Sequence, residues 1–186
     1  MNIAIYSGSF NPLHIGHLAI IKYMIEEAGF DMVYLIVSPK NPLKEGISSA
    51  TGLDRYNAAV AAVGRRSLSQ VRVDDIELNM PEPHYTVRTL RALKEREPEN
   101  SFTFVMGADN LADIRRWREH TAILKDFGVA VFPRIGHDLT EIKQDLLKED
   151  PAYKIQILDV PLVNISSTEI REAISKGEAS PTKVMR

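Results

Sequence analysis

The sequence contains no cysteine, and this excludes disulfides, thiolate zinc sites and cysteine nucleophiles together. It also lacks an excess of positive charge. Lys and Arg number 23 and Asp and Glu number 25, whereas a protein that binds nucleic acid non-specifically usually carries a basic surplus. No apolar run approaches the roughly 20 residues of a membrane helix, and the opening MNIAIYSGSF lacks the pattern of a signal peptide. We therefore expect a cytoplasmic protein that binds neither nucleic acid nor membrane.

Two common nucleotide-binding fingerprints, G-x-G-x-x-G and G-x-x-x-x-G-K-[ST], are absent as well. The chain shows no internal repeat, no low-complexity tract and no linker. Its 186 residues are enough for one hydrophobic core but too few for two comfortable domains. Residues 1–186 are therefore predicted to form a single domain.

Short apolar runs alternate with longer helical patterns along the chain. Strands are predicted over residues 2–6, 32–37, 71–78, 102–106, 129–132 and 155–160. Helices are predicted over residues 15–28, 53–63, 86–97, 111–118, 121–127, 140–149 and 169–176, with Thr51 as a cap and Gly29 as a stop. This alternation is typical of the α/β class and predicts a doubly wound parallel sheet in a three-layer α/β/α arrangement. Ligands of such sheets bind beyond the carboxyl ends of the strands.

The stretch SGSFNPLHIGHLAII, from Ser7 to Ile21, joins the first predicted strand to the first helix. Gly8 permits a ligand to approach the backbone closely, and the helix start offers free amides and a positive dipole end. His14 and His17 lie beside that helix start, where imidazole donors could hold a polyphosphate through an in-line displacement. Two other interpretations stay open, namely capping or surface histidines and a metal-binding pair.

The stretch ISSTEIR, from Ile165 to Arg171, follows the last predicted strand. Ser166 and Glu169 have the spacing of a capping box, which is a purely structural role. The hydroxyl groups, the helix start and Arg171 would also form a second phosphate site. The two interpretations are compatible, because a capped helix start still directs some amides toward a ligand.

The string GSFNPLHIGH resembles the signature G-[ST]-F-[DN]-P-x-H-x-G-H of the HIGH-motif nucleotidyltransferases, and ISSTEIR resembles the second motif of the same superfamily. The resemblance implies a Rossmann-like fold and transfer of a nucleoside monophosphate with release of pyrophosphate. It implies catalytic roles for His14, His17 and Arg171. It also implies ATP-binding roles for Gly8, Ser9, Phe10, Gly107, Asp109, Ile165, Ser166, Ser167 and Thr168. Mg²⁺ is expected to arrive on the ATP rather than in a protein cage, and no residue is assigned as a metal ligand.

Three segments in the middle of the chain, SPKNPLK, HYTVRTL and FVMGADNLADIRRW, resemble the bacterial nicotinate-nucleotide adenylyltransferases. The resemblance extends from Met1 to about Gly177. It implies that the substrates are ATP and nicotinate mononucleotide, and that the products are deamido-NAD and pyrophosphate in NAD biosynthesis. The residues it assigns to the mononucleotide are Lys44, Tyr85, Thr86, Trp117 and Arg134.

Each of these positions also has an ordinary structural interpretation. Asp109 and Thr86 are candidate helix caps, and Trp117 is a candidate core residue. Lys44 and Arg134 are candidate surface charges. Three further arginines, Arg115, Arg116 and Arg118, are predicted to form a solvated helical face.

The chain departs from the family pattern in three places. Its loop reads Asn-Pro-Leu-Lys where many relatives have Pro-Pro-His-Lys, His84 replaces the usual Ser, and the tail GEASPTKVMR is short. Two alternatives therefore stay open: the same chemistry on nicotinamide mononucleotide or phosphopantetheine, and a catalytically inactive nucleotide-binding protein. A homo-oligomer is compatible with the sequence.

Overall fold

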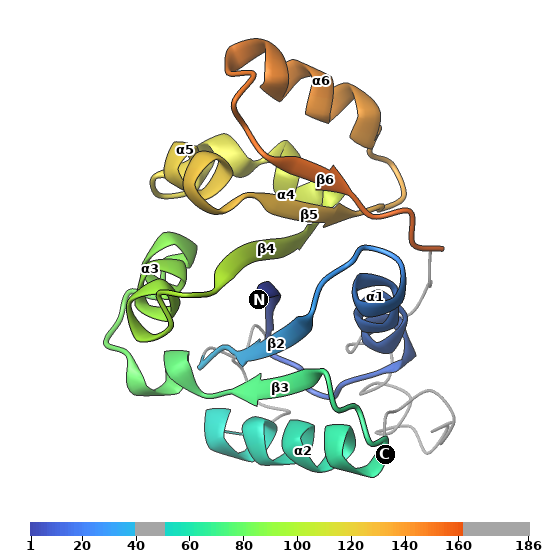
Figure 1. Ribbon diagram of the computed structural model, residues 1–186, viewed down its shortest axis with the longest axis vertical. Helices are drawn as coiled ribbons and strands as arrows, with labels where there is room; N and C mark the ends of the chain where they lie inside the picture. Colours follow the sequence, from blue (N-terminus) through green and yellow to red (C-terminus); the bar gives the residue numbers. More distant parts are fainter. Residues whose placement is uncertain (40–50, 162–186) are drawn as a thin grey trace.

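The computed structural model describes residues 1–39 and 51–161, and in this part six strands form one sheet. Their order is β3-β2-β1-β4-β5-β6, and every neighbouring pair is parallel. Figure 1 shows the sheet from β6 at the top to β3 at the bottom. The strands are β1 Asn2–Gly8, β2 Met32–Val37, β3 Val71–Asp74, β4 Ser101–Gly107, β5 Val129–Phe132 and β6 Ile155–Ile157.

Helices cover both faces of the sheet (Figure 1). One face carries α1 Ile15–Glu26 and α2 Gly52–Arg65, whose buried side chains join the first core cluster. The other face carries the remaining helical elements, whose buried side chains join the second core cluster. These are η1 Ile76–Asn79, α3 Thr86–Arg96, α4 Ala108–Ala112, η2 Ile114–Arg116, α5 His120–Ala122, η3 Ile123–Phe127 and α6 Leu139–Glu149. The predicted three-layer, doubly wound arrangement is confirmed.

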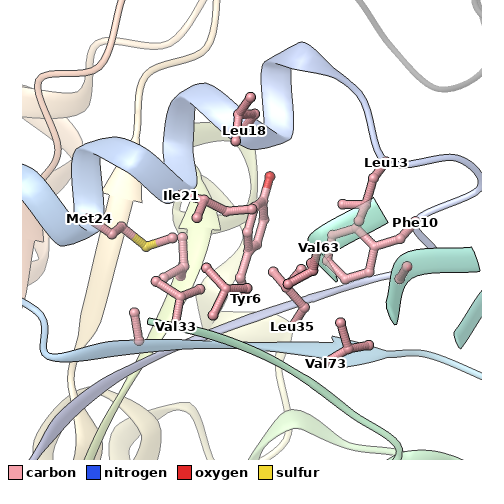
Figure 2. Close-up of a cluster of buried hydrophobic side chains, with 14 of the residues drawn as sticks. Tyr6, Phe10, Leu13, Leu18, Ile21, Met24, Val33, Leu35, Val63 and Val73 are labelled. Atoms are coloured by element: carbon pink, nitrogen blue, oxygen red, sulfur yellow. The ribbon is translucent and has the colours of Figure 1, made fainter. Parts of the chain in front are cut away.

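The alternation of side chains along each strand builds the two cores. In β1, Ala4 and Tyr6 belong to one cluster, while Ile3 and Ile5 belong to the other. Successive residues of a strand point to opposite faces, so a strand covered on both faces must be apolar throughout. Figure 2 shows Tyr6 pointing from the sheet toward α1, in the first cluster.

The strand order reverses between β1 and β4. From β1 the chain proceeds through β2 to β3 on one side, and then returns to β4 on the other side. In open parallel sheets a crevice forms at this reversal, beyond the carboxyl ends of the two strands. Gly8 ends β1 and Gly107 ends β4, so the two predicted glycine-bearing turns flank the same crevice.

The segment predicted as one strand over 71–78 is instead divided. β3 ends at Asp74, and the four residues Ile76–Asn79 form the 3₁₀ turn η1. The Asp74 carboxylate accepts from the Ile76 amide at 3.0 Å and from two nitrogens of Arg96 at 3.2 and 2.6 Å. This ion pair with α3 turns the chain out of the sheet. The last strand is also shorter than predicted, because β6 pairs with β5 over three residues only.

The helix predicted over 111–118 is replaced by two short elements. α4 begins earlier, at Ala108, and ends at Ala112, and η2 then covers Ile114–Arg116. The amides of Asp113 and Trp117 bond to carbonyls three residues back, which tightens the turn, and Trp117 itself is extended. The three arginines are exposed, as predicted, but Arg118 lies beyond η2, so they do not share one helical face. No helix within residues 1–39 and 51–161 is long and apolar enough to cross a membrane.

Candidate active site

The turn after β1 contains a residue in the left-handed conformation, Phe10, with φ of 45°. Such strain costs about 1–3 kcal/mol and persists where the surroundings enforce it. Here the Phe10 side chain is buried and meets the Tyr6 ring edge-on at 5.5 Å (Figure 2). A Cβ on Gly8 would lie 3.4 Å from the Phe10 ring, which is an ordinary contact. Packing among the described residues therefore does not require glycine at position 8, and its role in ligand approach stays a prediction.

Arg55 binds carbonyl groups of two segments, the turn after β1 and the residues that follow β2. Its Nη1 donates to the carbonyl oxygens of Ser9 at 2.9 Å and Ser38 at 2.6 Å, and its Nη2 donates to that of Pro39 at 3.1 Å. Arg55 is 2% exposed. In a trans peptide the N–H points opposite to the C=O, so holding the Ser9 carbonyl toward Arg55 turns the Phe10 amide away from it.

The two histidines form a reciprocal cap at the start of α1. His14 is the N-cap, and its Nδ1 accepts from the Gly16 amide at 3.0 Å. The Nδ1 of His17 accepts from the His14 amide at 3.1 Å. The rings stack at 3.7 Å between centroids with 27° between their planes. The capping interpretation is therefore confirmed, and in both rings the cap engages the Nδ1 atom.

These caps determine the tautomer of both rings. A nitrogen that accepts from an amide carries no proton, so in the neutral ring the proton lies on Nε2. Each histidine can then donate one hydrogen bond from Nε2 to a ligand. A metal would require a bare Nε2 lone pair and a proton on Nδ1, which would break both caps. In the described residues no group of three His, Cys, Asp or Glu side chains could hold a metal ion.

Burial keeps His17 neutral. It lowers the pKa of His17 well below its usual range, and the neighbouring His14 ring and Arg134 guanidinium lower the pKa further. The His17 ring also meets the edges of Tyr6 at 5.9 Å and Phe10 at 5.2 Å. His17 is thus a neutral hydrogen-bond donor with a fixed orientation, whereas a positive charge on it is disfavoured before any anion arrives.

Asp109 and Arg134 come together at the carboxyl ends of β4 and β5. The Arg134 Nε lies 3.7 Å from Asp109 Oδ1, and the guanidinium carbon lies 5.0 Å from the Phe132 ring centroid. Gly107, not Asp109, is the N-cap of α4, so the capping interpretation of Asp109 is wrong. A Cβ on Gly107 would lie 2.6 Å from Asp109 Oδ1 and 3.1 Å from Arg134 Nε. Glycine at position 107 lets these two side chains meet.

A separate pocket brings together three of the predicted mononucleotide residues, Tyr85, Thr86 and Trp117. It has a volume of about 260 Å³ and is also lined by His84, Arg116, Arg118 and Ile123. Both contributing segments leave carboxyl ends of strands, since α3 follows β3 and η1, and Trp117 follows β4 and α4. The pocket is therefore formed by segments that follow the carboxyl ends of β3 and β4, and the histidine turn follows the carboxyl end of β1 at the same edge of the sheet.

Thr86 does not cap α3, although the sequence made it a candidate for that role. Tyr85 occupies the N-cap position, no side chain caps the helix, and its first turn holds no acidic residue. Thr86 is therefore the first helical residue rather than the cap. Trp117 packs edge-on against Phe104 at 5.9 Å and also lines the pocket, so it serves the core and the pocket at once.

The sequence analysis missed Arg55, Arg116 and Arg118. Arg116 and Arg118 are exposed, as predicted, and they also line the pocket, whereas Arg115 pairs with Glu149 at 2.7 Å. A signal for Arg55 exists in the sequence, because it lies at helical spacing from the buried Ala59, Ala62 and Val63 of α2. An arginine on an apolar stripe needs a buried partner.

Several predicted site residues lie outside the described part of the chain. They are Lys44, Arg171, Ile165, Ser166, Ser167 and Thr168, and the helix predicted over 169–176 lies outside it too. The second phosphate site predicted from ISSTEIR therefore stays a prediction.

Residues 5–173 match the cytidylyltransferase-like family model. A probable nicotinate-nucleotide adenylyltransferase of Flavobacterium johnsoniae is 38% identical over 178 residues, covering 96% of this chain and 89% of the relative. Another, of Flavobacterium psychrophilum, is 38% identical over 175 residues, covering 94% and 86%.

Solved structures agree on the fold. Nicotinic acid mononucleotide adenylyltransferase of Plasmodium falciparum, complexed with NaAD, superposes with a TM-score of 0.70 at 23% identity, covering 92% of this chain and 82% of that one. A putative nicotinate-nucleotide adenylyltransferase from Vibrio parahaemolyticus gives a TM-score of 0.67 at 22% identity, covering 100% and 94%. The resemblance predicted from the motifs is confirmed, and the chain belongs to the cytidylyltransferase-like nucleotidyltransferases and, within them, to the nicotinate-nucleotide adenylyltransferase family.

Proposed function

We propose that this protein transfers AMP from ATP to nicotinate mononucleotide, giving deamido-NAD and pyrophosphate in NAD biosynthesis. Its relatives are named for this activity. The observation that carries the proposal is the pocket shared by Tyr85, Thr86 and Trp117. An aromatic face beside a helix start without side-chain caps suits a positively charged pyridinium ring that bears a carboxylate.

The reaction needs little covalent help from the protein. The phosphate of the mononucleotide is already anionic near neutral pH, so it attacks the α-phosphorus of ATP in line without a side-chain base. The bond to the β-phosphate breaks, pyrophosphate leaves, and no covalent enzyme intermediate forms. The Nε2–H groups of His14 and His17 are proposed to donate to the α-phosphoryl oxygens as negative charge builds up on them.

Asp109 and Arg134 are proposed to act beside this centre. The Asp109 carboxylate would accept from the ribose hydroxyls of ATP once its partner moves. The Arg134 guanidinium lies near enough to His17 to lower the pKa of that ring, so it would bind the acceptor phosphate where this phosphate meets ATP. Gly8, Ser9 and Phe10 would supply backbone contacts to the nucleotide, and Gly107 would allow it to approach β4.

The remaining assignments stay predictions. Lys44 would bind phosphate from the loop after β2. Ile165, Ser166, Ser167, Thr168 and Arg171 would hold the leaving β- and γ-phosphates. Mg²⁺ is proposed to be held by the triphosphate rather than by this chain, since the Nδ1 atoms of His14 and His17 are occupied by backbone amides. Bound there, it would neutralise the charge of the leaving pyrophosphate.

The decisive experiment follows pyrophosphate release with ATP and Mg²⁺ and one acceptor at a time. Nicotinate mononucleotide, nicotinamide mononucleotide and phosphopantetheine are each supplied at equal concentration. We expect the highest kcat/KM with nicotinate mononucleotide and deamido-NAD as the product. Turnover with phosphopantetheine alone would replace the proposed acceptor, and ATP binding by calorimetry without turnover on any acceptor would indicate an inactive nucleotide-binding protein.

Three broader properties complete the proposal. Residues 1–186 would act as a single domain, in the cytoplasm, and with small molecules rather than nucleic acid or membrane as ligands. A homo-oligomer is compatible with this function. Cell fractionation tests the compartment, and light scattering on the purified chain tests the oligomeric state; sedimentation with the membrane fraction would contradict the first.

A further inference from the structure

The charged side chains that line the pocket proposed to bind the acceptor are all positive. Two arginines, Arg116 and Arg118, line it, and no acidic residue does. Other arginines nearby have carboxylate partners. Arg115 pairs with Glu149, and Arg91 makes two bonds to Glu119 at 2.8 and 3.0 Å. Within residues 1–39 and 51–161 no ion pair joins Arg116 or Arg118 to a carboxylate, although the charge of Arg118 helps to lower the pKa of the neighbouring Glu119. The pocket therefore presents positive charge to a ligand.

Of these two arginines, Arg118 is better positioned to bind an anion in the pocket. Its guanidinium carbon lies 5.1 Å from the centre of the Tyr85 ring, a distance at which a cation is attracted to the ring face. Tyr85 is also the N-cap of α3, so this contact places the guanidinium beside the helix start. A guanidinium stacked on an aromatic ring loses less freedom when it binds, because its plane is already oriented.

The acid and amide forms of the acceptor differ at one point. Both carry the same pyridinium ring, which would stack on Trp117 equally well, and both have an oxygen that a backbone amide can bond. Only the acid offers two equivalent acceptor oxygens and a negative charge, which a guanidinium binds through two parallel bonds. The amide would instead bring its own N–H donors against those of the arginine, so a cation here adds to the preference for an anion that the helix start provides.

We propose that Arg118, held by the Tyr85 ring, is the residue that makes this pocket prefer the carboxylate acceptor over its amide. The inference depends on the proposed function for the identity of the ligand. It differs from the assignment of Tyr85, Thr86 and Trp117, which would bind either form. Arg118 is a specificity-determining residue that contacts the substituent of the ring and takes no part in the phosphoryl transfer.

The single tryptophan of the sequence provides a test that does not need turnover. Trp117 lines the pocket, so quenching of its fluorescence by a pyridine nucleotide reports occupancy directly. Dissociation constants are measured for nicotinate mononucleotide and nicotinamide mononucleotide with the wild-type protein, Arg118→Gln and Arg116→Gln. Arg115→Gln, three residues away and paired with Glu149, is the matched control.

We expect the ratio of amide to acid dissociation constants to fall by about tenfold to a hundredfold in Arg118→Gln, the range for losing a charged hydrogen bond. The control should keep the wild-type ratio, and Arg118→Lys should restore part of the preference. Equal weakening of both ligands in Arg118→Gln would assign Arg118 to the phosphate or to packing and overturn the inference. A loss of preference in Arg116→Gln instead would overturn it as well.

The pyrophosphate assay separates this inference from the proposed function. If no acceptor turns over but the binding ratio still depends on Arg118, the catalytic proposal fails and the inference holds. If nicotinate mononucleotide turns over and the ratio does not depend on Arg118, the inference fails alone. In active protein, Arg118→Gln should raise KM for the acid and leave kcat close to the wild-type value.

Discussion

The histidine turn and the pocket proposed to bind the acceptor, called the acceptor pocket below, are built in opposite ways. The histidine turn comes from one continuous stretch. His14 is buried, and its polar atoms and those of His17 engage the backbone of the same helix start. The acceptor pocket draws on α3 and on the residues after η2. Tyr85 is 40% exposed there, and the two pocket arginines have no carboxylate partner among the described residues.

The difference separates a rigid part of the site from an adaptable part. Transfer at the α-phosphorus demands donors fixed in place, because reorganising them during the reaction would cost activation free energy. Recognition of the acceptor depends on charge and stacking, which side chains at the surface can supply. Substitutions in the turn should therefore change kcat, and substitutions in the pocket should change KM and the choice of acceptor.

The largest expected effect comes from His17→Gln. A glutamine at the third helical position can still bond back to the N-cap amide, so the cap survives while the imidazole donor is lost. We expect kcat to fall by about 10²–10³-fold, the usual cost of removing one such donor. The measurement is pyrophosphate release at saturating ATP and acceptor. His137→Gln, on an exposed loop, is the control, and an unchanged kcat in His17→Gln would remove the role assigned to it.

Arg55→Met tests whether hydrogen bonds from α2 stabilise the turn after β1. Its removal leaves the carbonyls of Ser9, Ser38 and Pro39 without this donor. The free energy of unfolding should fall by about 1–3 kcal/mol, as expected for buried groups left unpaired, and KM for ATP should rise. Urea denaturation and steady-state kinetics measure both. Arg65→Met, on the exposed side of the same helix, should alter neither; equal losses in the two variants would show that the effect belongs to α2 in general.

Trp117→Leu tests whether the acceptor pocket binds the pyridinium ring through an aromatic face. Leucine keeps an apolar group against Phe104 but removes the aromatic face. A cation–π contact contributes about 0.5–2 kcal/mol, so KM for the pyridine mononucleotide should rise roughly twofold to thirtyfold while KM for ATP stays the same. Trp117→Phe should show a smaller change. A rise in KM for ATP as large as that for the acceptor would mean that the pocket and the turn are not independent.

The smallest effect concerns pH. The folded protein holds His17 neutral because its pKa lies well below 6.5, the value expected in the unfolded chain. As the pH falls through about 6.5 the unfolded chain binds a proton at this site and the folded chain does not, so the free energy of unfolding decreases. Above that pH the site contributes no pH dependence.

Denaturation curves at about pH 7.5, 6.5 and 5.5 measure this loss. His17→Gln lacks the titrating ring and should lose less stability on acidification than the wild type does. Because the rings of His14 and His17 stack at 3.7 Å and interact electrostatically, the difference between the two slopes reports on this histidine pair. Identical slopes would show that the imidazole titrates alike in the folded and unfolded chains.

Much of the fold could be predicted from the sequence because the hydrophobic pattern depends on local geometry. The strands at 32–37 and 129–132 were predicted with their observed bounds, and Thr51 caps α2 through Asp54. Predicted bounds were wrong where a residue distant in the sequence contacts the strand. Arg96 ends β3 by pairing with Asp74, a contact across 22 positions that no periodicity records.

In the candidate site, too, local features could be predicted from the sequence and contacts between distant residues could not. GSFNPLHIGH lies in one contiguous stretch, so the capped turn before α1 could be recognised in the sequence, since a helix cap needs only neighbouring residues. The same local caps decide the tautomer of the histidines. The Asp109–Arg134 pair and the entry of Arg118 into the pocket were decided by tertiary structure alone. Each depends on burial or on strands brought side by side, and both arise only when the sheet has formed.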